Sequence, residues 1–313
     1  MSGKKAADRK ASRMKCKHGI ECMDTGRSNW LFFTVMLSIL GGNIFLSAAD
    51  PGAGILKQLS VNFLCVSVPG MIFSRGLRWD DWSEHGRDKR AGPAEWLLEA
   101  LFMVLNVPML MAVNMLSMFI TENKVEKYSG SITSVPLVPV IILAGILLPF
   151  AEEYVFRGLI MGGYNTSGRE GLAVLFSAVM FGLYHLNLNQ MAYTSVFGLV
   201  LGFAAAASGN IWTAVFMHMA FNITELVIMY MNAGGGSSYV PCTGSAAIMS
   251  ASAIICTCIS VIPIRKAAEL AGRKDKLKRA ADPRYESCIG FNEGLCPLFF
   301  TVTVCIFLII LSV

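Results

Sequence analysis

Nine apolar stretches, each long enough or nearly long enough to cross a lipid bilayer, constrain this chain more than any other feature. They cover about residues 30–49, 55–73, 96–120, 135–161, 172–186, 191–207, 211–231, 246–264 and 297–313. A spanning helix needs about 20 mostly apolar residues, and lipid leaves no water for unpaired backbone groups. With 54% hydrophobic and 15% charged residues, the composition also belongs to the membrane class. We predict an all-α integral membrane protein, a bundle of about eight or nine transmembrane helices with a buried polar site.

The basic residues indicate how such a bundle is oriented. Residues 1–28, 74–94 and 265–295 hold eight, five and eight Lys or Arg, whereas the loops on the opposite side hold only two. Basic residues collect in cytoplasmic loops, so we expect the N-terminus inside. This topology accounts for the net charge of +5, and we expect the lipid bilayer and no nucleic acid as partner. The short loops and basic tails favour a bacterial plasma membrane.

Three charged residues interrupt the fourth apolar stretch. Glu152, Glu153 and Arg157 lie in a run that is otherwise apolar from 135 to 160. A charge at a helix centre costs about 2.5 to 3.5 kcal/mol on insertion scales, so buried charges generally serve a site. Glu153 and Arg157 are four residues apart and share one helix face, while Glu152 points about 100° away. We therefore expect Glu153 and Arg157 to pair, which leaves Glu152 free to act.

Two further apolar stretches carry polar residues. His185 follows Phe181 by four residues in the fifth, and His218, Asn222 and Glu225 follow i, i+4, i+7 spacing in the seventh. Taken singly, a membrane histidine is more often a packed residue, and an asparagine can join two helices by a hydrogen bond. Together with Glu152 they supply a base, two imidazoles and an amide. Proton relay, metal ligation or hydrolysis would use that set.

These residues also carry a family resemblance. The sequences E-E-Y-V-F-R at 152–157, F-G-L-Y-H at 181–185 and H-M-A-F-N at 218–222 resemble the three motifs of the CPBP family of intramembrane proteases. This family includes CAAX prenyl endopeptidases and bacteriocin-processing or immunity proteins. The motifs occur in the family's order, and the resemblance covers about residues 130–235. It is specific in combination and weak for any one motif.

The resemblance implies an eight-helix-like catalytic core and a role for each motif residue. Glu152 would activate a water, His185 would assist that water, and His218 with Asn222 would polarise the scissile carbonyl. Glu153 and Arg157 would support the site. The leading hypothesis is therefore an intramembrane endopeptidase that acts on a membrane-associated peptide or protein, lipidated or not.

The apolar pattern, the charges and the resemblance divide the chain into four parts. We expect a basic cytoplasmic tail at 1–28, N-terminal transmembrane helices at 29–129, a CPBP-like catalytic core at 130–235, and C-terminal helices at 236–313 with a basic cytoplasmic loop at 265–295. Cys16, His18 and Cys22 in the tail could offer soft ligands to zinc, but they lack a spaced second half. A tail with reduced thiols is the favoured interpretation.

Two alternatives remain open. We expect no cofactor, but a zinc version of the protease would use ligands among Glu152, Glu153, His185 and His218, although the chain lacks an H-E-x-x-H helix. The other alternative is a non-hydrolytic membrane protein, either an immunity or scaffold factor or a proton-coupled transporter. The sequence names neither the substrate nor the bond that would be cleaved.

Overall fold

The computed structural model describes residues 23–75, 92–123, 128–165, 170–233, 242–281 and 295–311. Every regular element in these ranges is a helix, as the sequence predicts. The Cys16, His18 and Cys22 group, most of the basic tail and parts of the other two basic segments lie outside the described residues. The expected division into four parts stays a prediction.

The helices follow the predicted apolar stretches closely. Seven helical units are long and apolar enough to span a membrane: α2 (Thr25–Ala49), α3 (Ile55–Phe73), α5 (Pro93–Ser117), the composite unit Leu137–Asn165, α12 (Leu188–Ser208), α13 (Ile211–Met231) and α14 (Thr243–Leu270). Two shorter apolar helices, α11 (Glu170–Tyr184) and α16 (Leu295–Leu311), occupy the other two predicted stretches. Two short helices, α7 (Ser129–Thr133) and α15 (Lys274–Ala281), complete the described elements. The chain is an integral membrane protein.

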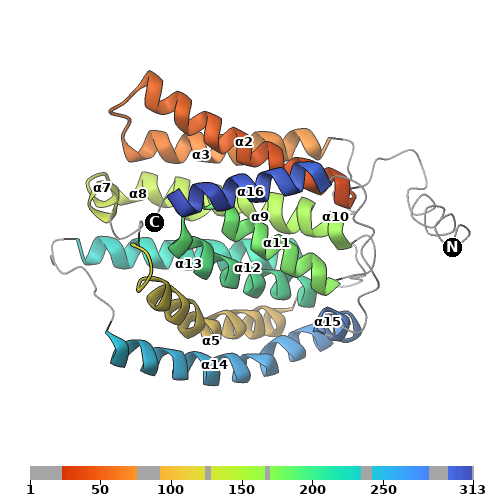
Figure 1. Ribbon diagram of the computed structural model, residues 1–313. Coiled ribbons are helices and arrows are strands. Elements are labelled where there is room, and N and C mark those ends of the chain that lie inside the picture. The colour runs from red at the N-terminus through yellow and green to blue at the C-terminus, as the bar shows by residue number, and fades with distance from the viewer. Residues whose placement is uncertain are drawn as a thin grey trace, which may run out of the picture.

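The composite unit is one helix with several internal windings. It runs through α8 (Leu137–Val140), η1 (Ile141–Leu147), α9 (Leu148–Glu153), η2 (Tyr154–Ile160) and α10 (Met161–Asn165), and η1 and η2 are π-helical. In Figure 1 it lies in the middle of the molecule together with α11, α12 and α13. The α2–α3 hairpin and α16 cover one side of this middle group, and α5 with α14 cover the other. The segment α9, which ends in the acidic pair, contacts α3 and α13, one helix from each half of the chain.

The first helix begins earlier than its hydropathy suggests. Asp24 caps α2 by accepting a hydrogen bond from Arg27 N at 2.8 Å, so the helix starts inside the segment assigned to the tail. Ser28 and Asn29, at the end of this first turn, are buried, and Tyr164 of α10 donates a 2.5 Å hydrogen bond to Asn29 Oδ1. Hydropathy alone misses this turn because its polar groups are satisfied by another helix.

Side-chain caps also fix the starts of α12 and of α13, the helix that carries the third motif. Asn187 caps α12 by accepting from Gln190 N at 2.9 Å, and Asn210 caps α13 by accepting from Trp212 N at 3.0 Å. Only Gly209 and Asn210 separate α12 from α13. This tight turn sets the two helices side by side, and His218 then lies two turns into α13.

Candidate active site

The acidic pair occupies the α-helical segment between two π-helical segments. Glu152 and Glu153 end α9, with η1 before them and η2 after them. A π turn adds a residue to each hydrogen-bonded ring and often marks a functional site. Both carboxylates are buried, with 4% of Glu152 and none of Glu153 exposed. The helix thus presents two carboxylates to the protein interior.

One carboxylate oxygen of Glu153 contacts both Arg157 and His218. Its Oε1 accepts a 2.6 Å ion-pair hydrogen bond from Arg157 Nη1 and lies 2.8 Å from His218 Nδ1. Arg157 also donates from Nη2 to the carbonyl of Gly198 at 3.3 Å. The expected Glu153–Arg157 pair is present. Its contact with His218 was not expected, and it ties the first motif to the third.

Glu152 faces the other nitrogen of the same imidazole. His218 Nε2 lies 3.7 Å from Glu152 Oε2, so the ring stands between the two carboxylates. An ionised Glu153 requires a proton on Nδ1, because a carboxylate only accepts hydrogen bonds. Nε2 is then the nitrogen available to a substrate or water beside Glu152. The Tyr184 hydroxyl also interacts with the Glu152 carboxyl.

Aromatic rings enclose this polar chain. Phe181 and Phe197 meet His218 edge to face, with centroids 5.8 Å and 5.0 Å from the imidazole. The Arg157 guanidinium carbon lies 4.5 Å from the Phe181 centroid, a cation–π contact. The rings exclude water from the buried charges and hold the imidazole in place.

His185 lies at the end of α11, half-buried, in contact with the same phenylalanine. Its ring centroid is 5.0 Å from that of Phe181, and its Nδ1 lies 2.8 Å from the Phe181 carbonyl. Within the described residues, no hydrogen bond or ion pair joins His185 to Glu152 or to His218. The next residue, Leu186, has a φ of 50°, which is uncommon for a residue with a branched side chain. His185 is therefore near the chain of contacts but not part of it.

Asn222 is anchored to the composite helix. Its Nδ2 donates to the carbonyl of Ala144 in η1 at 3.1 Å. A π turn would offer this carbonyl to the N–H of residue 149, just as Leu148 N–H bonds to Leu143 O, but Pro149 has no N–H. The Asn222 amide therefore takes the place of the missing backbone donor. One N–H of the amide remains for another acceptor.

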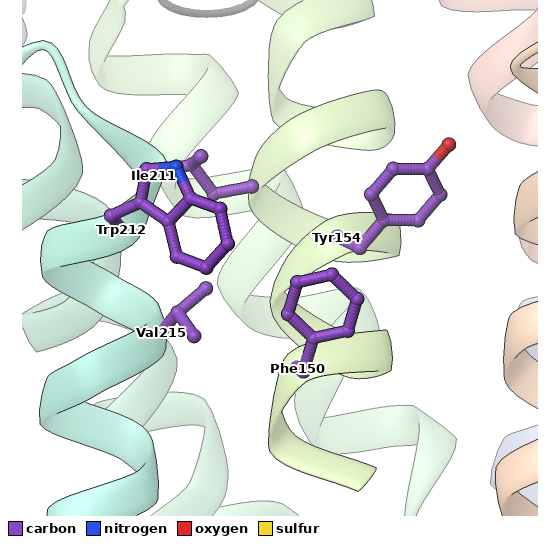
Figure 2. Close-up of a pocket in the computed structure, with 5 residues that line it drawn as sticks. All are labelled: Phe150, Tyr154, Ile211, Trp212 and Val215. Atoms are coloured by element: carbon purple, nitrogen blue, oxygen red, sulfur yellow. The ribbon is translucent and has the colours of Figure 1, made fainter. Parts of the chain in front are cut away.

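A small apolar pocket lies beside the site and is separate from its chemistry. Phe150 and Tyr154 of the composite helix line it together with Ile211, Trp212 and Val215 of α13. Figure 2 shows the Phe150 ring and the α13 side chains facing one another, with the Tyr154 hydroxyl directed away from them. The pocket lining contains no carboxylate or imidazole, so it does not provide the reacting groups.

Within the part of the chain that the structure describes, the donor atoms of the site contact one another. Among the residues that the structure describes, no group of three or more His, Cys, Asp or Glu is placed to hold an ion. Glu153 Oε1 and His218 Nδ1 already bind each other, and Arg157 also bonds to the same oxygen. The zinc version of the hypothesis would have to displace these contacts.

The sequence analysis assigned no role to two residues of the site. Tyr184 immediately precedes His185 and interacts with Glu152, and Phe197 packs against His218. Tyr184 could have been suspected because it lies inside the second motif. Phe197 gave no signal, since an aromatic residue in an apolar helix is ordinary.

Comparison with known proteins agrees with the motifs. Residues 134–224 match a family model described as "Type II CAAX prenyl endopeptidase Rce1-like". This segment includes all three motifs. No solved structure matches the chain.

A curated relative is a Bacillus subtilis (strain 168) protein named "Putative membrane peptidase YdiL". It is 34% identical over 100 residues, which are 32% of this chain and 40% of the relative. The similarity thus spans less than half of either protein.

Proposed function

We propose, from the match of residues 134–224 to the family model of Rce1-like type II CAAX prenyl endopeptidases, that this chain is an intramembrane endopeptidase with Glu152 as its general base. The observation that carries the proposal is the buried chain of contacts Arg157–Glu153–His218–Glu152. If both carboxylates are ionised and His218 is doubly protonated, these four groups are neutral in total. Buried charges are tolerated when they are paired in this way.

The reaction follows from the position of each group. Glu152 accepts a proton from a water molecule while the water oxygen attacks the peptide carbonyl carbon. The carbonyl oxygen becomes an oxyanion, and the His218 Nε2–H donates to it. Glu152 then passes the proton to the amide nitrogen, the C–N bond breaks, and a carboxylic acid and an amine leave. A positioned general base contributes on the order of 10² to 10⁴-fold to such a reaction.

The remaining motif residues fit supporting roles. The free N–H of Asn222 is a second donor for the oxyanion, and loss of one such donor typically costs about 10² to 10³-fold. Glu153 fixes the His218 ring through Nδ1, and Arg157 balances the charge of Glu153. We assign His185 the role of positioning the attacking water. It would contact this water only after substrate binds. Catalytic hydrogen bonds are often long before substrate binds.

The substrate class follows from the family and the membrane location. The substrate is a peptide or protein that reaches the bilayer. Because the family description names prenyl endopeptidases, a peptide with a prenylated C-terminus is the first substrate to test. We also propose the bacterial plasma membrane, with the N-terminus in the cytoplasm, as the location.

The test uses the full chain purified in detergent and reconstituted in liposomes. Wild type and Glu152→Gln are given a quenched fluorescent peptide that ends in a farnesylated CAAX sequence, and the same peptide without the lipid. We expect wild type to cleave one of them and Glu152→Gln to be at least about 10²-fold slower. Size-exclusion profiles of the two proteins control for folding.

Three outcomes are informative beyond the rate itself. Equal cleavage by wild type and Glu152→Gln would remove Glu152 from the mechanism. Cleavage that stops on chelation and returns with zinc would favour the metal version. Should wild type cleave neither peptide, and should the membrane peptidomes of expressing cells be the same for both proteins, the non-hydrolytic immunity, scaffold or transporter class would be left.

A further inference from the structure

A third polar residue of α13 lies on the same stripe as His218 and Asn222 but takes no part in the contacts described so far. Glu225 is seven residues beyond His218 and three beyond Asn222, so all three side chains point within about 60° of one another around the helix. Nothing in the proposed mechanism uses this carboxylate. It nevertheless lies on the same face of α13 as two residues of the candidate site.

Exposure increases steadily along this stripe. His218 is buried at 3%, Asn222 is intermediate, and Glu225 is exposed. The stripe therefore runs from the interior of the protein to its surface in the direction of the C-terminal end of α13. A peptide that approaches His218 along this stripe passes Glu225 first.

Glu225 has no cationic partner of its own among the described residues. None of the ion pairs within the part of the chain that the structure describes includes its carboxylate. Tyr193 of α12 lies beside it and hydrogen-bonds to Gln190, so its surroundings are polar but not basic. A carboxylate within a membrane-spanning helix is costly to place and generally serves a site. Because Glu225 is exposed on the stripe that leads to His218, it is placed to bind a positive charge from outside the protein.

We propose that Glu225 is a specificity-determining residue that receives a lysine or arginine side chain of the substrate. The proposal rests on the proposed endopeptidase function, because it places a substrate along the stripe that leads to His218. Tyr193 and Gln190 supply the polar flank of this subsite.

The helix fixes the distance between this subsite and the scissile bond. Seven residues of helix rise about 10 Å. An extended peptide advances about 3.3 to 3.6 Å per residue, so the same distance takes about three residues. The basic side chain is therefore expected three residues from the cleaved bond.

The experiment compares matched peptides on the reconstituted full chain. Starting from a peptide that wild type cleaves, lysine, glutamine or glutamate is placed three residues before the bond, and in a second set three residues after it. We expect wild type to prefer lysine over glutamine in one set by about fivefold in kcat/KM, as for an exposed ion pair. Glu225→Gln should reduce this ratio to about one, and Glu225→Lys should favour glutamate.

A matched control separates a local effect from a general loss of negative charge. Glu269 of α14 is also exposed and pairs with Lys266 and Lys274, away from the third motif. Glu269→Gln should leave the lysine-to-glutamine ratio as it is in wild type. A ratio that falls equally in both variants would overturn the proposal.

A binding measurement distinguishes this proposal from the endopeptidase proposal. The Glu152→Gln protein, with and without the added Glu225→Gln change, is photo-crosslinked to the lysine and glutamine peptides. If no peptide has been cleaved, lysine or glutamine is placed in turn at each position of the farnesylated CAAX peptide. Stronger crosslinking of a lysine peptide that disappears with Glu225→Gln then still supports the subsite. Equal crosslinking of the lysine and glutamine peptides at every position tested would overturn it, whatever the catalytic result.

Discussion

At the residue scale, Glu153 is the side chain on which most of the polar chain depends. Its single Oε1 contacts both Arg157 and His218 within 2.8 Å, whereas the contact of Glu152 with His218 is longer, at 3.7 Å. Removing one partner of a buried ion pair typically costs about 3 to 5 kcal/mol, because the other charge is left without compensation. The two adjacent glutamates should therefore respond differently to the same substitution.

We predict that Glu153→Gln destabilises the protein by about 3 to 5 kcal/mol, since Arg157 loses its counter-charge. Glu152→Gln should cost less, because the contact of Glu152 with His218 is longer, at 3.7 Å, than either contact of Glu153. Thermal unfolding midpoints in one detergent compare the two variants directly. Equal midpoints would show that Glu153 does not hold Arg157 and His218 as its distances indicate.

The bond between Asn222 and Ala144 gives a second prediction. In Asn222→Ala the partly buried Ala144 carbonyl loses its donor. A fully buried unsatisfied group costs about 1 to 3 kcal/mol, so we expect a cost at the low end of this range. In a Pro149→Ala background, the N–H of residue 149 can take over this carbonyl. The cost of Asn222→Ala should then be smaller.

A double-mutant cycle on unfolding midpoints measures this coupling. Strict additivity of the two changes would mean that the amide does not replace the proline's missing donor. Pro108→Ala in α5 serves as a control proline inside another helix, and it should not couple to Asn222→Ala.

At the scale of the elements, the crossing of α11 and α12 positions the second motif against the first. Gly198 of α12 lies so close to Ala178 of α11 that a Cβ at residue 198 would be 2.9 Å from the Ala178 Cα. The Gly198 carbonyl also accepts the hydrogen bond from Arg157. A backbone atom cannot yield as a side-chain end can, so any side chain at 198 must separate the two helices.

We predict that Gly198→Ala lowers stability by about 1 to 3 kcal/mol, as overpacking of a core does. Gly41 of α2 is the matched control, because a Cβ there would meet no atom within 4 Å. Gly41→Ala should be neutral, or more stable by about 0.5 to 1 kcal/mol from the lower chain entropy of alanine. A Gly198→Ala protein as stable as the Gly41→Ala protein would contradict the close packing of α11 on α12.

The composite helix also shows what a sequence can and cannot predict at this scale. The Glu153–Arg157 pair follows from i, i+4 spacing and is present. The π segments on either side of α9 were not predicted, because their turns depend on which carbonyls find other donors. Asn222 is one such donor, and it lies on another helix.

At the scale of the whole molecule, the sequence predicted the helices well and their contacts poorly. Apolar stretches follow from composition, so all nine predicted stretches coincide with helices. The motif spacing predicted which residues would gather, but not that Glu153 would contact His218. That contact depends on how α9 and α13 are rotated toward each other, which periodicity within one helix cannot give. The roles of the site residues remain predictions.

The orientation of the molecule in the membrane is a prediction that Cys242 can test. With the N-terminus inside, the segment between α13 and α14 faces outward, and Cys242 is exposed there as the N-cap of α14. A hydrogen bond with the Ser245 side chain lowers the pKa of the Cys242 thiol below its ordinary value. A lower pKa gives more thiolate at neutral pH, and the thiolate is the form that reacts with maleimide.

We therefore expect a membrane-impermeant maleimide to label a variant that keeps only Cys242 in intact cells. A variant that keeps only Cys258, within α14, is the control and should stay unlabelled because its thiol faces the bilayer. Ser245→Ala should move the pH dependence of labelling to higher pH, since it removes the hydrogen bond that stabilises the thiolate. Labelling of Cys242 only after the cells are permeabilised would place this segment in the cytoplasm. The orientation inferred from the basic residues would then be reversed, and the C-terminal end of α13 with Glu225 would open toward the cytoplasm.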